Sequence, residues 1–156
     1  MALVDAALRA IIATQKLSYA ATVNPDGTPN LSPKGSIEAW DDRHVICADI
    51  ASPATVRNLR ANPAIEINVL DPFSRRGYRI RGRGTVKDAG PELEAVKGAL
   101  TRRFGDLYPV TGVVVVEVTA VRAVVSPSYM FDPGAEESAI RREWMGIYKA
   151  RPVEAD

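Results

Sequence analysis

The chain has very few of the residues that build metal centres and disulfide frameworks. Its 156 residues include one cysteine, Cys47, and one histidine, His44. A single cysteine excludes an internal disulfide and favours a reducing compartment, so we predict a cytoplasmic protein. A structural zinc site of the usual kind is excluded within one chain, because too few nitrogen and sulfur ligands are present. We expect no metal, and we expect Cys47 to be a buried structural thiol.

Long apolar runs and a strong net charge are also lacking. The valine run at 113–116 is far shorter than the roughly 20 apolar residues that cross a bilayer. A formal net charge of +1 creates no strong field for non-specific binding to nucleic acid. The first residues lack the early basic cluster and the cleavage-site pattern of a secretory signal. We therefore expect neither a membrane nor a nucleic-acid partner.

The composition is that of an ordinary folded domain, with 46% hydrophobic and 25% charged residues. The length suits one domain, and the sequence contains no internal repeat and no low-complexity segment. We predict a single domain at 1–150 followed by a frayed C-terminal tail at 151–156.

Hydrophobic periodicity predicts a mainly β protein with several helices. The predicted helices are 2–15, 53–62, 91–104 and 134–149. The predicted strands are 17–23, 28–32, 36–40, 44–48, 64–70, 78–87 and 110–125. We expect the last strand, rich in β-branched residues, to bend near Ala120. The order shows no regular βαβ alternation, so an antiparallel barrel with peripheral helices fits better than a doubly wound sheet.

Two small-polar segments, 31–36 and 51–59, indicate the two halves of an anion site. Lys34 can contact a phosphate as a point charge, and Gly35 lets the backbone approach closely. Pro53 suits the first turn of a helix, and a helix start offers unpaired N–H groups and partial positive charge. The alternative is an ordinary lysine beside a glycine bulge.

Polar side chains around the start of that helix allow two interpretations. Ser52 and Thr55 can donate hydroxyl hydrogen bonds to the anion, or either can simply cap the helix. Asn58 follows Thr55 by three residues and shares its helix face, so its amide can bond the polar edge of a ring.

The most basic stretch of the chain is 75–81. In a strand, Arg79 and Arg81 share one face, and Tyr78 shares the other with Ile80. The stretch could form a cationic, aromatic-lined wall for an anionic ligand. Equally, it could be a solvated edge strand whose charges discourage pairing with another sheet.

The usual catalytic and nucleotide-binding motifs are missing. His44 directly follows a predicted turn, and no GxSxG accompanies it, which disfavours a Ser-His-Asp hydrolase. Neither a GxGxxG in strand–helix context nor a GxxxxGK[ST] occurs. Trp40 and Trp144 suit either a core or a subunit contact.

Three fragments, ATVNPDGTPNLSPKGS, ICADIASPATVRNLRANP and RRGYRIRGRGTV, carry a resemblance to a known family. The chain resembles the pyridoxamine 5'-phosphate oxidase-like FMN-binding split barrels over about residues 5–126, in particular their small single-domain, general-stress-like members. The resemblance implies a mainly β (α+β) fold, a six-stranded antiparallel split β-barrel with peripheral helices. It also implies a homodimer that binds FMN in two clefts between the subunits.

The resemblance assigns cofactor-binding roles to twelve positions of this chain. Those expected to line the flavin or its phosphate are Ser32, Pro33, Lys34 and Gly35. Those expected to run beside the flavin ring are Asp49, Ile50 and Ala51. Those expected to complete the phosphate end are Ser52, Thr55 and Asn58. The partner subunit is expected to contribute Arg76 and Tyr78.

The chain departs from the true oxidases at three places, the first of which is the absence of a basic residue in the strand near Ser32. Where their helix opens with a basic pair, this sequence has Ala54 and Thr55. Their pyridoxal-phosphate-binding C-terminal segment has no counterpart in EWMGIYKARPVEAD. These departures argue against vitamin B6 oxidation.

The resemblance therefore predicts an FMN-binding flavoprotein, an oxidoreductase that transfers hydride or electrons at the flavin, with no catalytic side chain assigned. The alternatives are a non-catalytic flavin-storage or stress-sensor module, and a split barrel that holds a deazaflavin or a heme. For heme, His44 is the only histidine that could act as a ligand.

Overall fold

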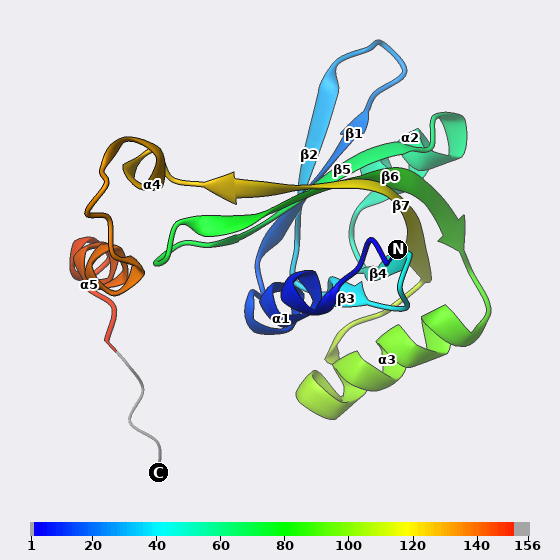
Figure 1. Ribbon diagram of the computed structural model, residues 1–156. Helices are drawn as coiled ribbons and strands as arrows, with labels where there is room; N and C mark the ends of the chain where they lie inside the picture. The colour runs from blue at the N-terminus through cyan, green and yellow to red at the C-terminus, as the bar shows by residue number, and fades with distance from the viewer. Residues whose placement is uncertain (1, 152–156) are drawn as a thin grey trace.

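The structure, a computed structural model, describes residues 2–151 and is built on one antiparallel sheet that curls into a half-barrel (Figure 1). The strands are β1 (Ser18–Val23), β2 (Pro29–Lys34), β3 (Glu38–Ala39), β4 (His44–Asp49), β5 (Ala64–Asp71), β6 (Arg76–Lys87) and β7 (Gly112–Val125). Their order in the sheet is β2-β1-β5-β6-β7-β4-β3. This confirms the predicted split-barrel class, with seven strands in place of six.

The helices lie around the sheet, as predicted, with the predicted bounds at 91–104 and different bounds elsewhere. They are α1 (Ala6–Thr14), α2 (Pro53–Ala61), α3 (Pro91–Phe104), α4 (Ser128–Phe131) and α5 (Glu137–Ile147), with a 3₁₀ turn, η1, at Gly105–Leu107. The helix predicted from residue 2 begins at Ala6, because Asp5 is its N-cap and accepts a hydrogen bond from the Leu8 amide at 2.9 Å. The predicted helix at 134–149 is shorter, and the short α4 precedes it.

Two cores lie on opposite faces of the sheet where β4 and β7 pair. Val114 and Val116 point into the barrel core, which α1 and α2 close with apolar side chains. Val113 and Val115 point outward and are covered by α3. Burial on both faces explains why this part of β7 is a continuous valine run and not an alternating pattern.

Cys47 lies in the barrel core and is 1% exposed. Burial raises the pKa of its thiol to about 11. The prediction of a buried structural thiol is confirmed.

A bulge bends β7 where the sequence predicted a bend. Arg81 pairs with Ala120 but the next residue, Gly82, pairs with Val118, so Thr119 is the extra residue. At this point the two backbones come very close, since a Cβ atom on Gly82 would lie 2.5 Å from the Glu117 carbonyl oxygen. Only glycine allows this approach without a shift of β7.

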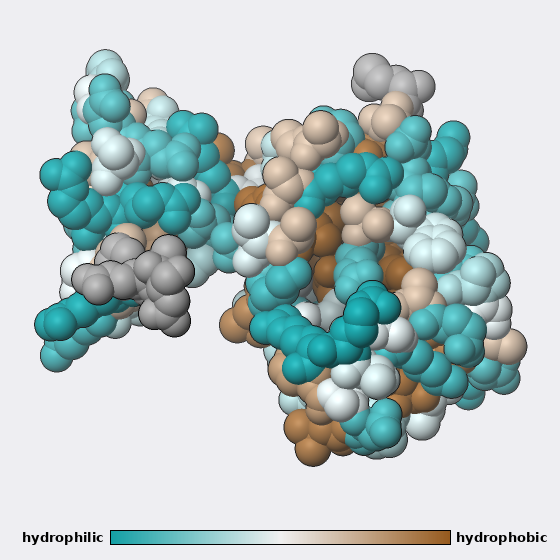
Figure 2. Space-filling view, turned by 90° about the horizontal axis from the view of Figure 1, so that it is seen from below, coloured by the Kyte–Doolittle hydropathy of each residue, from teal (hydrophilic) through white to brown (hydrophobic). Residues whose placement is uncertain are grey.

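The β5–β6 hairpin and the end of β7 extend beyond the barrel as an arm that carries α4 and α5 (Figure 1). Figure 2 shows this helical lobe standing apart from the body of the molecule across a narrow waist. The lobe is attached to the hairpin by an Arg141–Asp71 ion pair and by Arg75, whose guanidinium lies 4.1 Å from the centre of the Trp144 ring. Trp144 thus packs on the arm within one chain.

The predicted tail at 151–156 lies outside the described residues except for Arg151. No helix among residues 2–151 is both long enough and apolar enough to cross a membrane.

Candidate functional site

A buried lysine ammonium is the central feature of the candidate site. Lys34 ends β2 and is only 6% exposed. Its Nζ donates a hydrogen bond to Ser52 Oγ at 2.6 Å, and Ser52 Oγ donates in turn to Asp49 Oδ1 at 2.9 Å. Asp49 ends β4 and Ser52 precedes α2. The hydroxyl therefore links the buried cation to a carboxylate, which offsets part of the cost of removing the ammonium from water.

This hydrogen-bond chain shows that the Ser52 side chain does not cap α2, which was one of the two roles that the sequence left open. Ser52 occupies the N-cap position of α2, but its side chain makes no capping hydrogen bond. Its hydroxyl is used by Lys34 and Asp49 instead. Pro53 is in the first turn, as predicted, and the structure gives the amides of Ala54 and Thr55 no intrahelical partner.

A cavity of about 240 Å³ opens over Lys34. Its walls come from the end of β2 with the turn after it, and from the end of β4 with the start of α2. The lining residues are Ser32, Pro33, Lys34, Gly35, Ser36, Ala48, Ile50, Ala51 and Ser52. The structure thus brings together the two segments that the sequence proposed as halves of one site, with Asp49 hydrogen-bonded to Ser52 beside them.

The cavity lies at the seam of the barrel. In the sheet, β2 is at one edge, and β4 with β3 is at the other. Curling of the sheet brings these ends together without pairing them as strands. The seam is joined instead by Lys34 with Ser52 and by Ser36, whose Oγ accepts a hydrogen bond from the Ala48 amide at 3.0 Å. Backbone N–H and C=O groups that would form hydrogen bonds between strands in a closed barrel therefore lie near the cavity.

A second cavity, of about 300 Å³, adjoins the first and shares Gly35, Ser36 and Ile50 with it. The outer wall is aromatic, since the rings of Phe104 and Tyr108 meet edge to face with centroids 5.2 Å apart. We call the two cavities together the seam cleft. Each is near the small end of the range of about 300–1,000 Å³ that is typical of small-molecule sites, and joined they lie within it.

Ser36 lies in the predicted segment 31–36, whereas Phe104, Tyr108 and Thr111 were not predicted as part of this region. Ser36, Phe104 and Tyr108 line the seam cleft, and Thr111 fixes Asp49 by hydrogen bonds to its backbone and carboxylate oxygens at 3.0–3.3 Å. Thr111 lies 62 residues from Asp49 in the sequence. No local pattern in the sequence predicts such a contact. Ser36, in contrast, follows Lys34 by two residues.

Thr55 and Asn58 share one face of α2, as predicted, but that face is turned away from the cavity. Asn58 Nδ2 donates to Thr22 Oγ1 at 3.1 Å and to Asn24 Oδ1 at 2.9 Å. Thr55 Oγ1 accepts a hydrogen bond from Asn30 Nδ2 at 3.4 Å. These side chains fasten α2 to the β1–β2 hairpin, and Thr55 is no helix cap. The structure does not bring them into the seam cleft.

Arg76 and Tyr78 lie on the arm, outside the seam cleft of their own chain. The Arg76 guanidinium lies 4.1 Å from the centre of the Tyr129 ring and 3.5 Å from Glu137. Tyr78 packs against the barrel core. A cofactor-binding role for Arg76 or Tyr78 would therefore require the seam cleft of a partner subunit.

His44 lies in a different part of the molecule. Its Nδ1 is 2.9 Å from both carboxylate oxygens of Asp41, and it lines a cavity that shares no residue with the seam cleft. Within residues 2–151, no group of three or more histidine, cysteine, aspartate or glutamate side chains is arranged to hold a metal ion.

The fold and the seam cleft define a split barrel with a buried cation between its two edges. The family described as pyridoxamine 5'-phosphate oxidase matches residues 4–126. The chain belongs to this pyridoxamine 5'-phosphate oxidase-like family. Among curated proteins, no significant match is found.

Several solved structures share the fold of this chain. HupZ from Group A Streptococcus is 30% identical, with a TM-score of 0.70 over 78% of this chain and 94% of its own. An FMN-binding protein from Syntrophomonas wolfei is 18% identical, with a TM-score of 0.69 over 76% of this chain and 84% of its own. An F420 reductase is 23% identical, with a TM-score of 0.59 over 76% of this chain and 98% of its own.

Proposed function

We propose that the protein binds FMN in the seam cleft and acts as an oxidoreductase. The observation that carries this proposal is the buried ammonium of Lys34 at the floor of a cavity built from the two predicted segments. Among the described residues, Nζ has one hydrogen-bond partner, Ser52, so two of its three N–H groups remain for a ligand. A buried cation with free donors favours an anionic group such as a phosphate.

The start of α2 adds to this preference. The free amides of Ala54 and Thr55 and the positive end of the helix dipole lie next to Ser52, which lines the cavity. The aromatic wall formed by Phe104 and Tyr108 suits a flat ring system at the other end of the seam cleft. We propose that the phosphate lies at Lys34 and that the ring lies beside Asp49, Ile50 and Ala51.

Bound FMN would supply hydride or electron transfer at its ring. The chain's own residues would then provide position and charge. Lys34 and the α2 amides would hold the phosphate, and Ile50 with the aromatic wall would limit access of water to the ring. Vitamin B6 oxidation is not part of the proposal, because the first turn of α2 holds Ala54 and Thr55 where a basic pair would stand.

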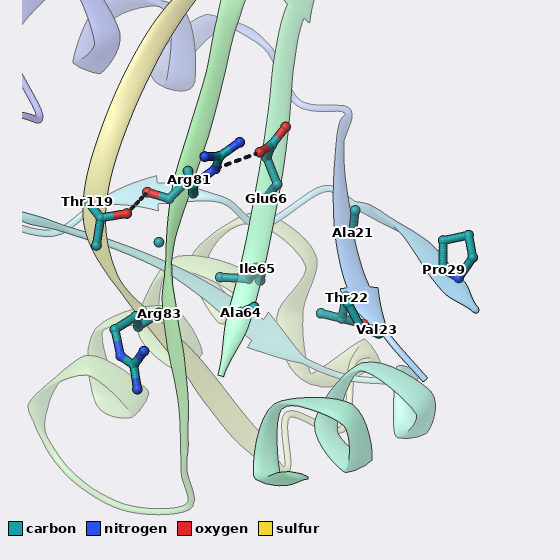
Figure 3. Close-up of a pocket in the computed structure, with 11 residues that line it drawn as sticks. Ala21, Thr22, Val23, Pro29, Ala64, Ile65, Glu66, Arg81, Arg83 and Thr119 are labelled. Atoms are coloured by element: carbon teal, nitrogen blue, oxygen red, sulfur yellow. Dashed lines mark hydrogen bonds and ion pairs between the residues drawn. The ribbon is translucent and has the colours of Figure 1, made fainter. Parts of the chain in front are cut away.

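We further propose that two copies associate through the outer face of β1, β2 and β5. Leu31 is 64% exposed there, and Tyr19 and Val23 are exposed beside it. The same face has a hollow of about 440 Å³ between β1 and β6, lined by Ala21, Glu66 and Arg81 among others (Figure 3). Exposed apolar residues around a hollow are typical of protein interfaces. A second copy here could bring its Arg76 and Tyr78 to the seam cleft.

The first experiment is to record the absorption spectrum of the purified protein and to titrate the cofactor-free protein with FMN. We expect quenching of flavin fluorescence at saturation, and we expect Lys34→Ala to weaken binding by about tenfold or more, since a charge-assisted hydrogen bond contributes about 1.5–3 kcal/mol. Lys97→Ala, which removes a surface lysine on α3, is the matched control. Unchanged affinity in Lys34→Ala would place the phosphate elsewhere.

Three further measurements test the finer parts of the proposal. Titration with the deazaflavin F420 in parallel with FMN tests the choice of cofactor. An assay of whether a nicotinamide cofactor reduces bound FMN, and whether an electron acceptor then gives turnover, distinguishes an enzyme from a flavin-storage module. For the dimer, Leu31→Glu should yield monomers in analytical ultracentrifugation, because it buries a charge at the proposed interface. A dimer that survives Leu31→Glu would exclude this face.

A further inference from the structure

A second polar cavity, of about 420 Å³, lies where β4, β6 and β7 meet the start of α3. It shares no residue with the seam cleft. Its volume falls in the range of about 300–1,000 Å³ that is typical of small-molecule sites. It is also the cavity that contains His44.

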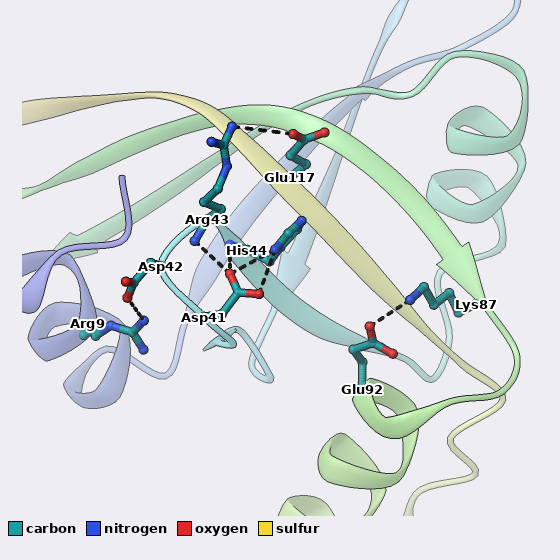
Figure 4. A network of polar contacts seen from close by, with 8 residues as sticks. All are labelled: Arg9, Asp41, Asp42, Arg43, His44, Lys87, Glu92 and Glu117. Atoms are coloured by element: carbon teal, nitrogen blue, oxygen red, sulfur yellow. Dashed lines mark hydrogen bonds and ion pairs between the residues drawn. The ribbon is translucent and has the colours of Figure 1, made fainter. Parts of the chain in front are cut away.

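Two pairs of polar side chains in this cavity contact each other (Figure 4). His44 Nδ1 lies 2.9 Å from Asp41, and Lys87 Nζ lies 2.7 Å from Glu92 Oε1. The hydrogen bond from Lys87 holds the pKa of Glu92 below its usual value, so the glutamate stays ionised and paired. The second carboxylate oxygen of Glu92, Oε2, is buried and has no hydrogen-bond partner among the described residues.

Two further charged residues of the cavity are opposite in sign but do not pair with each other. Arg83 on β6 and Glu117 on β7 are directly opposite in register and line the same cavity. Side chains in such positions have Cβ atoms about 4.5–5.5 Å apart, and opposite charges usually attract each other there. Glu117 instead reaches Arg43 at 3.7 Å, in a pair that is more than half exposed. Within residues 2–151, Arg83 lies within ion-pair distance of no carboxylate.

An apolar wall lies beside these two charges. The cavity is also lined by Trp40, Pro63 and Val115, and Trp40 is 37% exposed. A tryptophan that is left this exposed beside a cavity offers a broad apolar surface with one N–H donor at its edge.

We propose that this cavity binds a free α-amino acid. The ligand's carboxylate would accept hydrogen bonds from the Arg83 guanidinium, whose planar fork matches a carboxylate. Its ammonium would pair with Glu117, and its side chain would lie against Trp40. An α-amino acid carries its carboxylate and its ammonium close together. Arg83 and Glu117 likewise present opposite charges from neighbouring positions. A simple anion would face the repulsion of Glu117, and a simple cation that of Arg83.

Trp40 provides the measurement. Trp144 is replaced by phenylalanine, so that the tryptophan fluorescence of the protein comes from Trp40 alone. The probes are glycine, L-leucine, L-phenylalanine, L-glutamate and L-lysine, with acetate and methylammonium as compounds that carry one charge each. We expect a saturable change with at least one amino acid and no saturable change with acetate or methylammonium. Calorimetric titration of the unaltered chain makes the same comparison without the Trp144→Phe change.

Variants of the two charged residues complete the test. Arg83→Gln and Glu117→Gln should each weaken binding of the responding amino acid by about tenfold or more. Arg60→Gln, an exposed change on α2 outside the cavity, should leave the affinity unchanged. The proposal is overturned if none of the five amino acids binds, if acetate binds as tightly, or if binding survives either variant.

Discussion

Replacement of Ser52 by alanine should destabilise the cofactor-free protein. The change removes the acceptor that holds Lys34 Nζ at 2.6 Å and the donor that reaches Asp49. A buried polar group left without its partner costs about 1–3 kcal/mol, and more when the group is charged. We therefore expect Ser52→Ala to lower the free energy of unfolding by about 1–3 kcal/mol. For a domain of this size, this corresponds to about 2–4 °C in Tm for each kcal/mol.

Replacement of Lys34 by methionine should have a different effect on stability. Methionine has a similar length and removes the buried charge, and replacement of a buried charged group by an apolar side chain is often neutral or stabilising. We expect Lys34→Met to leave the free energy of unfolding unchanged or to raise it. The double variant should be less destabilised than Ser52→Ala alone, because no ammonium then remains to be satisfied.

Urea unfolding followed by tryptophan fluorescence measures all three variants, with the slope of the transition as a check that the compactness of the two states is unchanged. The reasoning is refuted if Lys34→Met destabilises the protein as much as Ser52→Ala, or if the two changes add independently. Either result would mean that Ser52 does not compensate the buried ammonium.

Three further predictions concern other parts of the molecule. Gly82→Ala should destabilise the protein by about 1–3 kcal/mol in urea unfolding, because the added Cβ would meet the β7 backbone. Gly146→Ala on α5 should be neutral or slightly stabilising, because a Cβ added there would have no atom within 4 Å. Burial raises the pKa of Asp71, but hydrogen bonds from two backbone amides and from Arg141 outweigh this and hold the pKa below its usual value. The stability that Asp71 contributes is therefore present above about pH 4 and lost as the pH falls through the folded-state pKa, and Asp71→Asn should reduce the loss of stability measured between neutral and acidic pH. Cys47 should not react with Ellman's reagent at neutral pH until the protein is unfolded, because its thiol is buried and has a pKa of about 11.

Local sequence signals were sufficient where the structure depends on local chemistry. Asp26 and Gly27 are typical turn residues and lie in the turn between β1 and β2, and Pro53 predicted the start of α2. The two halves of the seam cleft were found because each carries its own signal, a lysine with a glycine in one and a serine with a proline in the other. The start of α1 was missed, although Asp5 before an apolar run is itself an N-cap signal.

Contacts that depend on the curl of the sheet could not be predicted in this way. The spacing of Thr55 and Asn58 correctly placed them on one face of α2, but periodicity cannot say whether that face meets a cavity or a hairpin. Thr111 and Asp49 are too far apart in the sequence for a local pattern to connect them. The aromatic wall at Phe104 and Tyr108 depends on where α3 ends relative to β2. Such contacts follow from topology and not from local propensity.

The seam explains why a buried cation is tolerated at this position. β2 is an edge strand, and its two prolines, Pro29 and Pro33, can stand there because an edge strand needs no second ladder of hydrogen bonds. The barrel consequently closes through side chains, with Lys34 joined to Ser52 in place of a strand pair. A ligand phosphate at Lys34 would add hydrogen-bond acceptors and negative charge at the seam, where side chains close the barrel. Binding of the cofactor would thus stabilise the fold, by about 2.7 kcal/mol at a concentration of 100 times Kd, at the same place where it is recognised.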